Sequence, residues 1–240
     1  RSRPDVFVTA TAAATRAAMI ASPSAAILMA YGSDPVGNRL VASLARPGGR
    51  VTGMSNLAEG LVGKMFELLR TLVPSAQRLT LLVNPTNLTA AVYRTDAEDA
   101  ARALRIALTL IEVAAPDDLA LAFDRLRRDH AQGVIVTPDP MFLALRTRIV
   151  GLAARAGVPA IYNQREFVEA GGLMSYGASI RDAYARSAVF ADRILKGANP
   201  GELPVEQPTK FVLAINVPTA RTLSIAVPQA LLLRADEVIQ

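Results

Sequence analysis

The pattern of apolar and polar positions changes along this chain. From Arg78 onward, short apolar runs rich in β-branched residues alternate with amphipathic stretches long enough to form helices. The apolar runs are Leu79–Val83, Thr109–Val113, Gly133–Val136 and Ala160–Tyr162. The amphipathic stretches between them are Ala90–Leu104, Asp118–Arg128 and Phe142–Ala156. This alternation predicts an α/β fold whose parallel sheet is covered by helices on both faces.

The beginning of the chain predicts a smaller set of the same kind. Its predicted strands are Val6–Thr9, Ala26–Ala30 and Val51–Gly53, and its predicted helices are Ala12–Ala21 and Val36–Leu44. Three short strands make a poor sheet by themselves, so we expect later segments to return to them. Ser179–Leu195 is an amphipathic helix that can cover this block, and Phe211–Asn216 is a strand that can join the later sheet.

These elements predict two doubly wound parallel-sheet lobes. We expect the first lobe to hold residues 1–55 and 179–197, and the second to hold residues 56–178 and 198–240. Several segments would cross between the lobes, with a cleft between them. Sheets of this kind bind ligands beyond the carboxyl ends of their strands, which makes the loops at those ends the candidate site.

Composition narrows the possible functions. Hydrophobic residues make up 51% of the chain and charged residues 20%, which supports a sizeable core. The net charge of +5 comes from scattered arginines without a basic run, so we expect no nucleic-acid partner. Cysteine is absent and His130 is the only histidine, so no thiolate or histidine cluster can bind a metal. No run of 18 uncharged apolar residues predicts a membrane span.

Motifs of common catalytic and cofactor sites are missing. Gly63-Lys64 is followed by methionine instead of serine or threonine, which excludes a Walker A loop. The segment 53–57 lacks the final glycine of a nucleophile elbow. Asp117-Asp118 precedes an amphipathic run, where helix capping explains the pair. We therefore expect no enzyme activity, no cofactor and no catalytic residue.

Three polar loops follow strands of the later sheet. In the first, Asn84, Thr86 and Asn87 are candidates to hold an anionic ligand group, or else Thr86 or Asn87 only caps the next helix. In the second, Asp139 stands between two prolines, either as a rigid ligand contact or as a turn residue. In the third, Tyr162 offers an aromatic wall beside the amide of Asn163, and Glu166 is either a counter-charge or an ordinary helix-start carboxylate.

The first block supplies further candidates with the same geometry. Thr9, Thr11, Tyr31 and Asp34 follow its predicted strands, while Ser55 and Tyr176 fall where the lobes would join. Tyrosines, amides and hydroxyls with few metal ligands suit a small organic acid or amino acid that has an apolar or aromatic body. The sharpest hypothesis is that the 84–87 loop holds the ligand's anionic end while Asp34, Asp139 or Glu166 meets its amine.

Four segments resemble a known family. They are residues 44–53, 82–87, 165–177 and 203–211, which read LARPGGRVTG, LVNPTN, REFVEAGGLMSYG and LPVEQPTKF. Together they resemble the substrate-binding proteins of ABC importers in the tryptophan-binding TrpX-like group. The resemblance implies a type I periplasmic-binding-protein fold that traps ligand between its lobes. It also implies a permease partner and a periplasmic or membrane-anchored extracytoplasmic location.

The chain also departs from that family. Members normally have a further strand–helix–strand region, on the order of 70 residues, before the equivalent of Val6, so we expect an incomplete first lobe. No export signal precedes Val6 in this sequence. Two alternatives to a transport protein stay open. One is a ligand-sensing domain of a regulator or receptor on the same fold, and the other is a small-molecule enzyme on a doubly wound sheet.

Overall fold

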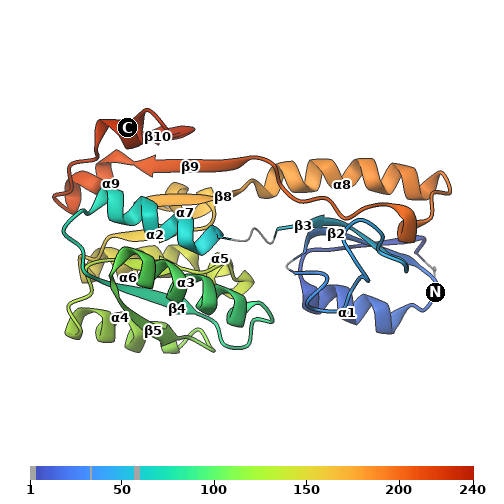
Figure 1. Ribbon diagram of the computed structural model, residues 1–240, viewed down its shortest axis with the longest axis horizontal. Coiled ribbons are helices and arrows are strands. Elements are labelled where there is room, and N and C mark those ends of the chain that lie inside the picture. The colour runs from blue at the N-terminus through green and yellow to red at the C-terminus, as the bar shows by residue number, and fades with distance from the viewer. Residues whose placement is uncertain (1–3, 33, 57–59) are drawn as a thin grey trace. The chain divides into compact units, whose positions relative to one another are not determined.

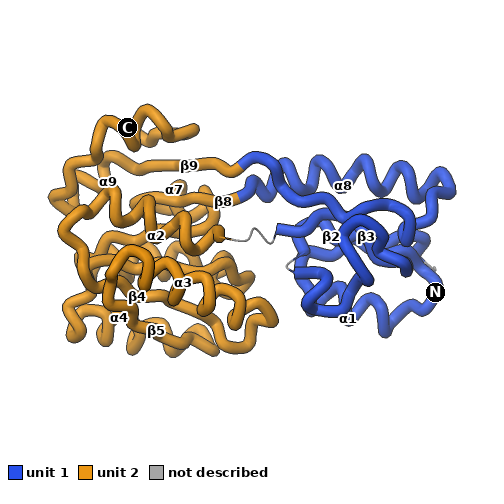
Figure 2. Tube along the Cα trace, viewed as in Figure 1, with its two compact units in different colours: residues 1–58, 178–210 blue, residues 59–177, 211–240 orange. Residues whose placement is uncertain are grey.

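The chain divides into two compact units. The computed structural model describes residues 4–32, 34–56 and 60–240. Unit 1 is formed by residues 1–58 and 178–210, and unit 2 by residues 59–177 and 211–240 (Figure 2). The segment 198–210, which we expected in the second lobe, belongs to unit 1. It does so because Glu206 pairs with the last strand of that unit, donating its N–H to Gly53 O and accepting from Ser55 N.

Unit 1 is a small parallel sheet with a helix on each face. Its strands β1 (Val6–Thr9), β2 (Ala26–Gly32) and β3 (Val51–Ser55) lie in the order β1-β2-β3. Helix α1 (Ala12–Ala21) covers one face, and α8 (Ile180–Leu195) covers the other (Figure 1). The short 3₁₀ helix η1 (Pro200–Glu202) contacts β3. Two separate hydrophobic clusters therefore flank this sheet.

Helix α8 reaches this sheet from far along the chain. Ser179 caps it by accepting a hydrogen bond from Asp182 N, and Ala183, Ser187 and Phe190 form its buried stripe. The helix contacts all three strands of unit 1, most extensively β2. This confirms the prediction that the late amphipathic stretch returns to cover the first block.

The predicted helix Val36–Leu44 is wrong, because the segment forms a series of turns. Gly37 and Asn38 are poor helix formers, and Arg39 has a left-handed φ of 54°. The Asp34 side chain accepts from Gly37 N, and Leu40 N and Val41 N both bond to Pro35 O. These turn bonds take the place of a helical ladder.

Unit 2 is built on a sheet of seven strands in the order β10-β9-β8-β7-β6-β4-β5. The strands are β4 (Arg78–Val83), β5 (Ala107–Glu112), β6 (Val134–Val136), β7 (Ala160–Tyr162), β8 (Met174–Ala178), β9 (Phe211–Asn216) and β10 (Glu237–Ile239). Strands β4 to β8 are parallel. The chain moves outward from β4 to β5 and then back to β6, so the strand order reverses between β4 and β6. Such a switch point is the usual ligand position in doubly wound sheets.

The last two strands depart from a purely parallel sheet. At the end of β9, Asn216 donates its N–H to Leu173 O, just before the start of β8, so β9 runs antiparallel to β8. Strand β10 pairs parallel with β9 and completes the sheet. Antiparallel edge strands of this kind are common on large α/β sheets.

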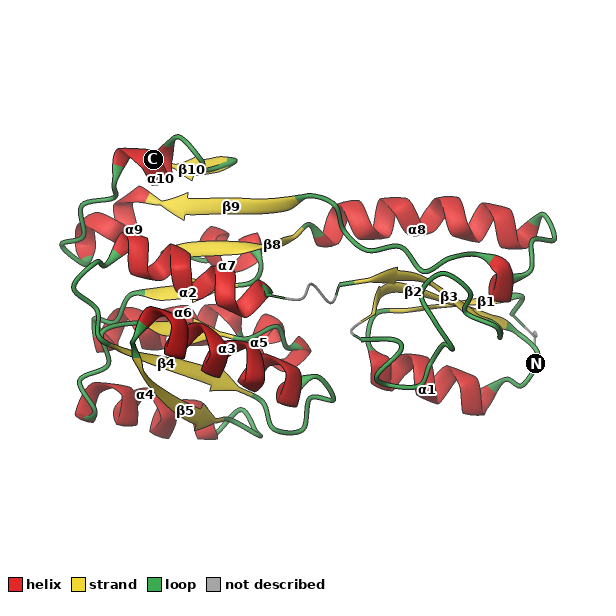
Figure 3. Ribbon diagram, in the orientation of Figure 1, coloured by secondary structure: helices red, strands yellow, loops and turns green. Residues whose placement is uncertain are grey.

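Helices cover both faces of the unit 2 sheet (Figures 1 and 3). Helices α4 (Asp118–Arg128), α5 (Pro140–Ala144), α6 (Arg146–Ala156) and α7 (Arg165–Glu169) share one hydrophobic cluster with strand side chains. Helices α2 (Leu61–Leu72) and α3 (Ala90–Leu104) pack on each other outside that cluster. The short α9 (Val217–Thr222) and α10 (Gln229–Leu232) follow β9.

The single predicted helix 142–156 is two helices in the structure. Leu145 separates α5 from α6, and the Arg146 guanidinium donates to Leu143 O at 3.2 Å. That bond gives the carbonyl a partner outside the helical ladder. In the part of the chain that the structure describes, no helix has the length and apolar character to cross a membrane.

Candidate functional site

Three loops of unit 2 lie at one edge of its sheet. Residues 84–87 follow β4, residues 137–139 follow β6, and residues 163–164 follow β7. Strands β4, β6 and β7 are neighbours and parallel, so their carboxyl ends share that edge. The candidate site therefore lies at the switch point and beside it.

Asp139 joins the first two loops. Its Oδ2 accepts from Asn84 Nδ2 at 3.1 Å and from Asn87 Nδ2 at 2.8 Å. Asn87 Nδ2 also donates to Pro138 O at 3.1 Å. The prediction that these residues come together is thus met by direct hydrogen bonds across the switch point.

The other oxygen of Asp139 caps a helix. Its Oδ1 accepts from Met141 N at 2.8 Å and Phe142 N at 3.2 Å, with Pro140 at the first helical position. A carboxylate has about four lone-pair sites, and all four now have donors. Asp139 is 8% exposed, so hydrogen bonds from these four donors replace most of the water around its carboxylate.

The amide oxygens of the first loop are also occupied. Asn84 Oδ1 accepts from Thr86 N at 3.0 Å and from Thr86 Oγ1 at 2.8 Å. Asn87 Oδ1 accepts in the same way from Thr89 N and Thr89 Oγ1. Helix α3 has Thr89 as its N-cap without a side-chain capping bond. The alternative that Thr86 or Asn87 caps this helix is therefore wrong.

The third loop carries buried amides without partners. Asn163 is 3% exposed and Gln164 is 7% exposed. Within the described ranges, neither side chain makes a hydrogen bond. Among the described residues, the fully enclosed side-chain atoms without a partner are Asn56 Oδ1, Arg94 Nε and Ser175 Oγ. The amide atoms of Asn163 and Gln164 are not among them, so these two groups keep some access to solvent and are available to a ligand. The sequence indicated Asn163 as an amide that can both donate and accept hydrogen bonds but did not single out Gln164, although both directly follow a buried strand.

Glu166 lies in the first turn of α7, close in sequence to these amides. Its side chain is half-buried and has no ion pair or hydrogen bond to any described residue. It therefore remains a candidate counter-charge for a cationic group.

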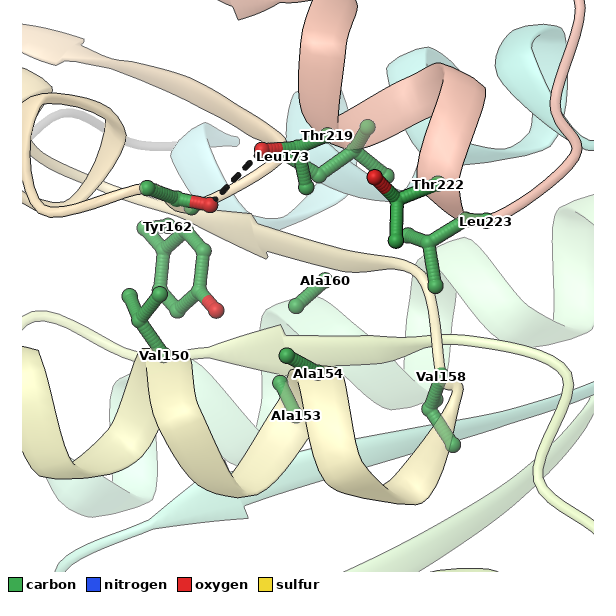
Figure 4. A pocket seen from close by; sticks show the side chains of 12 residues that line it. Val150, Ala153, Ala154, Val158, Ala160, Tyr162, Leu173, Thr219, Thr222 and Leu223 are labelled. Carbon is green, nitrogen blue, oxygen red and sulfur yellow. Dashed lines mark hydrogen bonds between the residues drawn. The ribbon is translucent and has the colours of Figure 1, made fainter.

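Tyr162 does not form a wall at this edge, which corrects the sequence prediction. Its ring is 1% exposed and stacks on Phe167 with centroids 4.5 Å apart. Figure 4 shows the ring directed into a small cavity between α6 and α9, where Thr219 Oγ1 donates to Gly171 O at 2.9 Å. The cavity holds about 40 Å³, whereas drug-sized ligand sites span roughly 300–1,000 Å³. Burial also raises the pKa of the Tyr162 phenol.

Tyr176 stays at the candidate edge. Tyr162 pairs with Ser175 in the β7–β8 register, which places Tyr176 opposite Asn163. Its ring stacks on Phe211 of β9, with centroids 5.6 Å apart and an interplanar angle of 23°. Gly177 follows, where a Cβ would lie 1.8 Å from Asn163 O, so only glycine permits this approach.

The unit 1 candidates divide into two groups. Thr9 Oγ1 bonds to Thr15 Oγ1 at 2.7 Å, and Thr11 Oγ1 accepts from Ala14 N as the N-cap of α1. Both threonines therefore have structural roles at the end of β1. The hydroxyls of Thr9 and Thr11 are thus both engaged within the protein.

The second group lies at the ends of two strands: Tyr31 is near the end of β2, Asp34 follows β2, and Ser55 is the last residue of β3. Tyr31 Oη donates to Ala178 O at a long 3.5 Å, and Asp34 Oδ1 accepts from Gly37 N at 2.8 Å. Ser55 is buried at the end of β3, where its N–H bonds to Glu206 O. The described residues contain no group of three or more His, Cys, Asp or Glu side chains that could hold a metal ion.

The fold of this chain has counterparts among solved structures. The chain superimposes on a periplasmic binding protein/LacI transcriptional regulator from Alkaliphilus metalliredigens with a TM-score of 0.57 and 11% identity. That match covers 87% of this chain and 75% of the other. At this identity the likeness shows the fold alone, and it agrees with the predicted type I periplasmic-binding-protein fold.

Within that class, the chain belongs to the ABC transporter substrate binding protein family, which matches residues 1–239. This confirms the family resemblance seen in the sequence. Members of this family bind solutes and are not enzymes, so the prediction of no catalysis is confirmed as well.

Two relatives have names that include an amino acid. A tyrosine-binding protein from Clostridioides difficile is 23% identical over 221 residues, which cover 92% of this chain and 63% of that protein. The chain thus spans less than two thirds of that relative's length. An ABC domain from Streptococcus pneumonia in complex with L-Trp has a TM-score of 0.91 and 23% identity, covering 98% of this chain and 79% of the other.

Proposed function

We propose that this chain binds an aromatic L-amino acid, or a closely related carboxylate, as the solute-binding component of an ABC importer. In this role it works outside the cytoplasm, either free in the periplasm or anchored to a membrane, and hands its ligand to a permease. Family membership supports the transport role. The tyrosine-binding and L-Trp-bound relatives support the ligand class.

The unpartnered amides of Asn163 and Gln164 carry this proposal at the level of the site. Each carboxamide has two N–H donors and one oxygen acceptor, so the pair can bind a carboxylate and an ammonium group. Both are buried, which strengthens any hydrogen bond that a ligand makes to them. A ligand with two polar ends on an apolar body suits this pattern.

The stacked rings of Tyr176 and Phe211 supply the apolar part of the argument. Tyr176 lies opposite Asn163 in the strand register, so an aromatic surface adjoins the free amides. Offset or edge contacts between aromatic rings add about 0.5–1.5 kcal/mol beyond burial of their area. This favours an aromatic side chain over a sugar ring.

Binding at this edge depends on loops that are rigid before the ligand arrives. The Asp139 network fixes the 84–87 and 137–139 loops beside the free amides. Preorganised groups lose little conformational entropy on binding, which raises affinity. In unit 1, Tyr31, Asp34 and Ser55 remain candidate ligand contacts, since Tyr31 and Ser55 lie at the ends of β2 and β3 and Asp34 follows β2.

Isothermal titration calorimetry tests the proposal. We expect L-tryptophan, L-tyrosine or L-phenylalanine to bind, with L-leucine weaker and glucose inactive. Asn163→Ala should lower the affinity by about tenfold to a hundredfold, as expected for the loss of a hydrogen bond to a charged group. Gln229→Ala is the matched control, because Gln229 is exposed on α10. Binding of sugars but not amino acids would contradict the proposed ligand class.

A further inference from the structure

The acidic residues at the edge of the unit 2 sheet differ in how much hydrogen-bonding capacity they have left. Asp139 has donors on both oxygens: two backbone N–H groups and two asparagine amides. Its four acceptor sites are therefore filled within the protein. A ligand ammonium would have to displace one of these donors in order to bind Asp139.

Glu112 and Asp34 are also engaged. Glu112, the last residue of β5, forms an ion pair with Arg94 at 2.5 Å. In unit 1, the Asp34 carboxylate turns back on its own loop to accept from Gly37 N at 2.8 Å. Each of these carboxylates already has a donor of its own.

Glu166 has none among the described residues, and it is half-buried. Two residues before it, Gln164 is 93% buried with its amide unpartnered, and Asn163 is in the same condition. One carboxylate and two amides with unused hydrogen-bonding capacity therefore follow strand β7 within four residues of one another. These observations together point to a ligand that brings a cation and an anion to this loop.

We infer that Glu166 accepts the ammonium group of the ligand, and that Asp139 is a positioning residue that never contacts it. This inference rests on the proposed function, because it assigns the residue of the same site that binds the amino group of the ligand. The carboxamides of Asn163 and Gln164 then take the ligand's carboxylate. The site consequently selects α-amino acids over aromatic carboxylates that lack the amine.

A thermodynamic cycle tests the assignment. The affinities of L-tryptophan and of indole-3-propionate, which lacks the amine, are measured by calorimetry for the wild type and for Glu166→Gln. Loss of a charge-assisted hydrogen bond should weaken L-tryptophan binding by about tenfold to a hundredfold. The affinity for indole-3-propionate should stay unchanged, because that ligand has no ammonium for Glu166 to bind. L-tyrosine and its desamino analogue serve in the same way if tyrosine binds more tightly.

Glu98→Gln is the matched control, since Glu98 lies exposed on α3 and should change neither affinity. Thermal melts of all variants check that the fold is intact. If Glu166→Gln weakens both ligands equally, or neither, the assignment of Glu166 is wrong while the proposed function stands. If the wild type binds no aromatic amino acid, the proposed function and this inference both fail.

Discussion

At the scale of single residues, Asp139 connects loops that are distant in the chain. Its partners Asn84 and Asn87 lie 55 and 52 residues away, and its other two bonds start helix α5. A buried carboxylate is costly unless donors surround it, and here four donors do. Asn84 also bonds Thr86 and Asn87 also bonds Thr89, so the network extends beyond the carboxylate.

Asp139→Ala should therefore lower the free energy of unfolding of unit 2 by about 2–4 kcal/mol. The substitution removes all four bonds and leaves the Asn84 amide without this acceptor, while the Asn87 amide keeps only its bond to Pro138 O. Urea denaturation followed by circular dichroism measures the loss. Glu98→Ala, at an exposed position on α3, should change stability by less than about 0.5 kcal/mol. An Asp139→Ala protein as stable as this control would contradict the structural role of the network.

Tyr162 presents the opposite case, a buried hydroxyl without a protein partner in the described part of the chain. Tyr162→Phe keeps the ring stack with Phe167 and removes only that hydroxyl. We expect the variant to be at least as stable as the wild type, with a gain of up to about 1–2 kcal/mol. Thermal and urea unfolding measure the difference. A clear loss of stability would mean that water in the cavity of Figure 4 bonds the hydroxyl.

At the scale of elements, α2 receives its N-terminal cap from a neighbouring helix. Gly60 stands at the N-cap position and has no side chain to offer. Asp96 of α3 supplies the acceptor instead, with Oδ2 bonded to Val62 N at 2.9 Å. Burial is the largest influence on this carboxyl and raises its pKa above the ordinary 3.8, against the hydrogen bonds from Gly63 and Val62. Capping and helix packing therefore depend on one side chain.

Asp96→Ala should cost about 1 kcal/mol of stability, whereas Asp96→Asn keeps a neutral acceptor and should cost less. The two variants also differ from the wild type in pH dependence. A raised pKa in the folded state means that the wild type loses stability as the pH rises from 3.8 through the folded value. Asp96→Asn should lack this loss. Urea unfolding between pH 3 and pH 6 checks the slope, and identical slopes would contradict the burial effect.

An ion pair between Arg186 of α8 and Glu206 links this helix to the segment 198–210. Arg186 Nε and Nη2 donate to the two oxygens of Glu206 at 2.7 and 2.8 Å. These bonds hold the pKa of Glu206 below its ordinary value of 4.5. The same residue pairs with β3 through its backbone.

Stability from this pair should be present above pH 4.5 and fall as the pH drops through the lowered pKa of Glu206. Glu206→Gln should therefore reduce the acid sensitivity of unit 1. Salt should weaken the effect, because the pair is partly exposed. Thermal melts between pH 3 and pH 6 at low and high ionic strength measure both trends. An unchanged acid profile in the variant would contradict the contribution of the pair.

Elements with regular patterns were predictable from sequence. The bounds of β1, α1, α3, α4, β7 and β9 agree with the predicted ranges, because each has clear periodicity between breaks. The segment 36–44 failed because turn bonds of Asp34 and Pro35 outweighed its helical pattern. Strand β10 was missed, since its pairing with β9 is a tertiary contact that a short tail does not signal.

The candidate site was predictable only in outline. Loops after consecutive strands had to share an edge, so the 84–87 and 137–139 loops were expected near each other. The sequence could not reveal that the Asp139 carboxylate accepts hydrogen bonds from two asparagines, because those bonds join residues that are distant in the chain. Nor could it show that Tyr162 faces the helices of the core while Asn163 and Gln164 keep unpartnered amides.

At the scale of the whole molecule, each unit is made of segments far apart in the chain. Helix α8 and η1 complete unit 1, while β9 and β10 complete the sheet of unit 2 (Figure 2). The hydrophobic clusters follow this division, since those with Ile27 and Phe190 belong to unit 1 and the one with Ile149 belongs to unit 2. Stability should accordingly follow the units and not the order of the sequence.

Two matched substitutions test this division. Ile27 and Ile149 are both fully buried, and replacing either with alanine should cost about 3 kcal/mol. Ile27→Ala should speed amide hydrogen exchange in β1, β2, β3 and the distant α8, and leave β4 to β7 and β9 unchanged. Ile149→Ala should do the reverse, with β9 exchanging together with β7 although α8 lies between them in sequence. Mass spectrometry of peptic fragments resolves these segments. Equal acceleration along the whole chain in both variants would mean that the molecule unfolds as one cooperative unit.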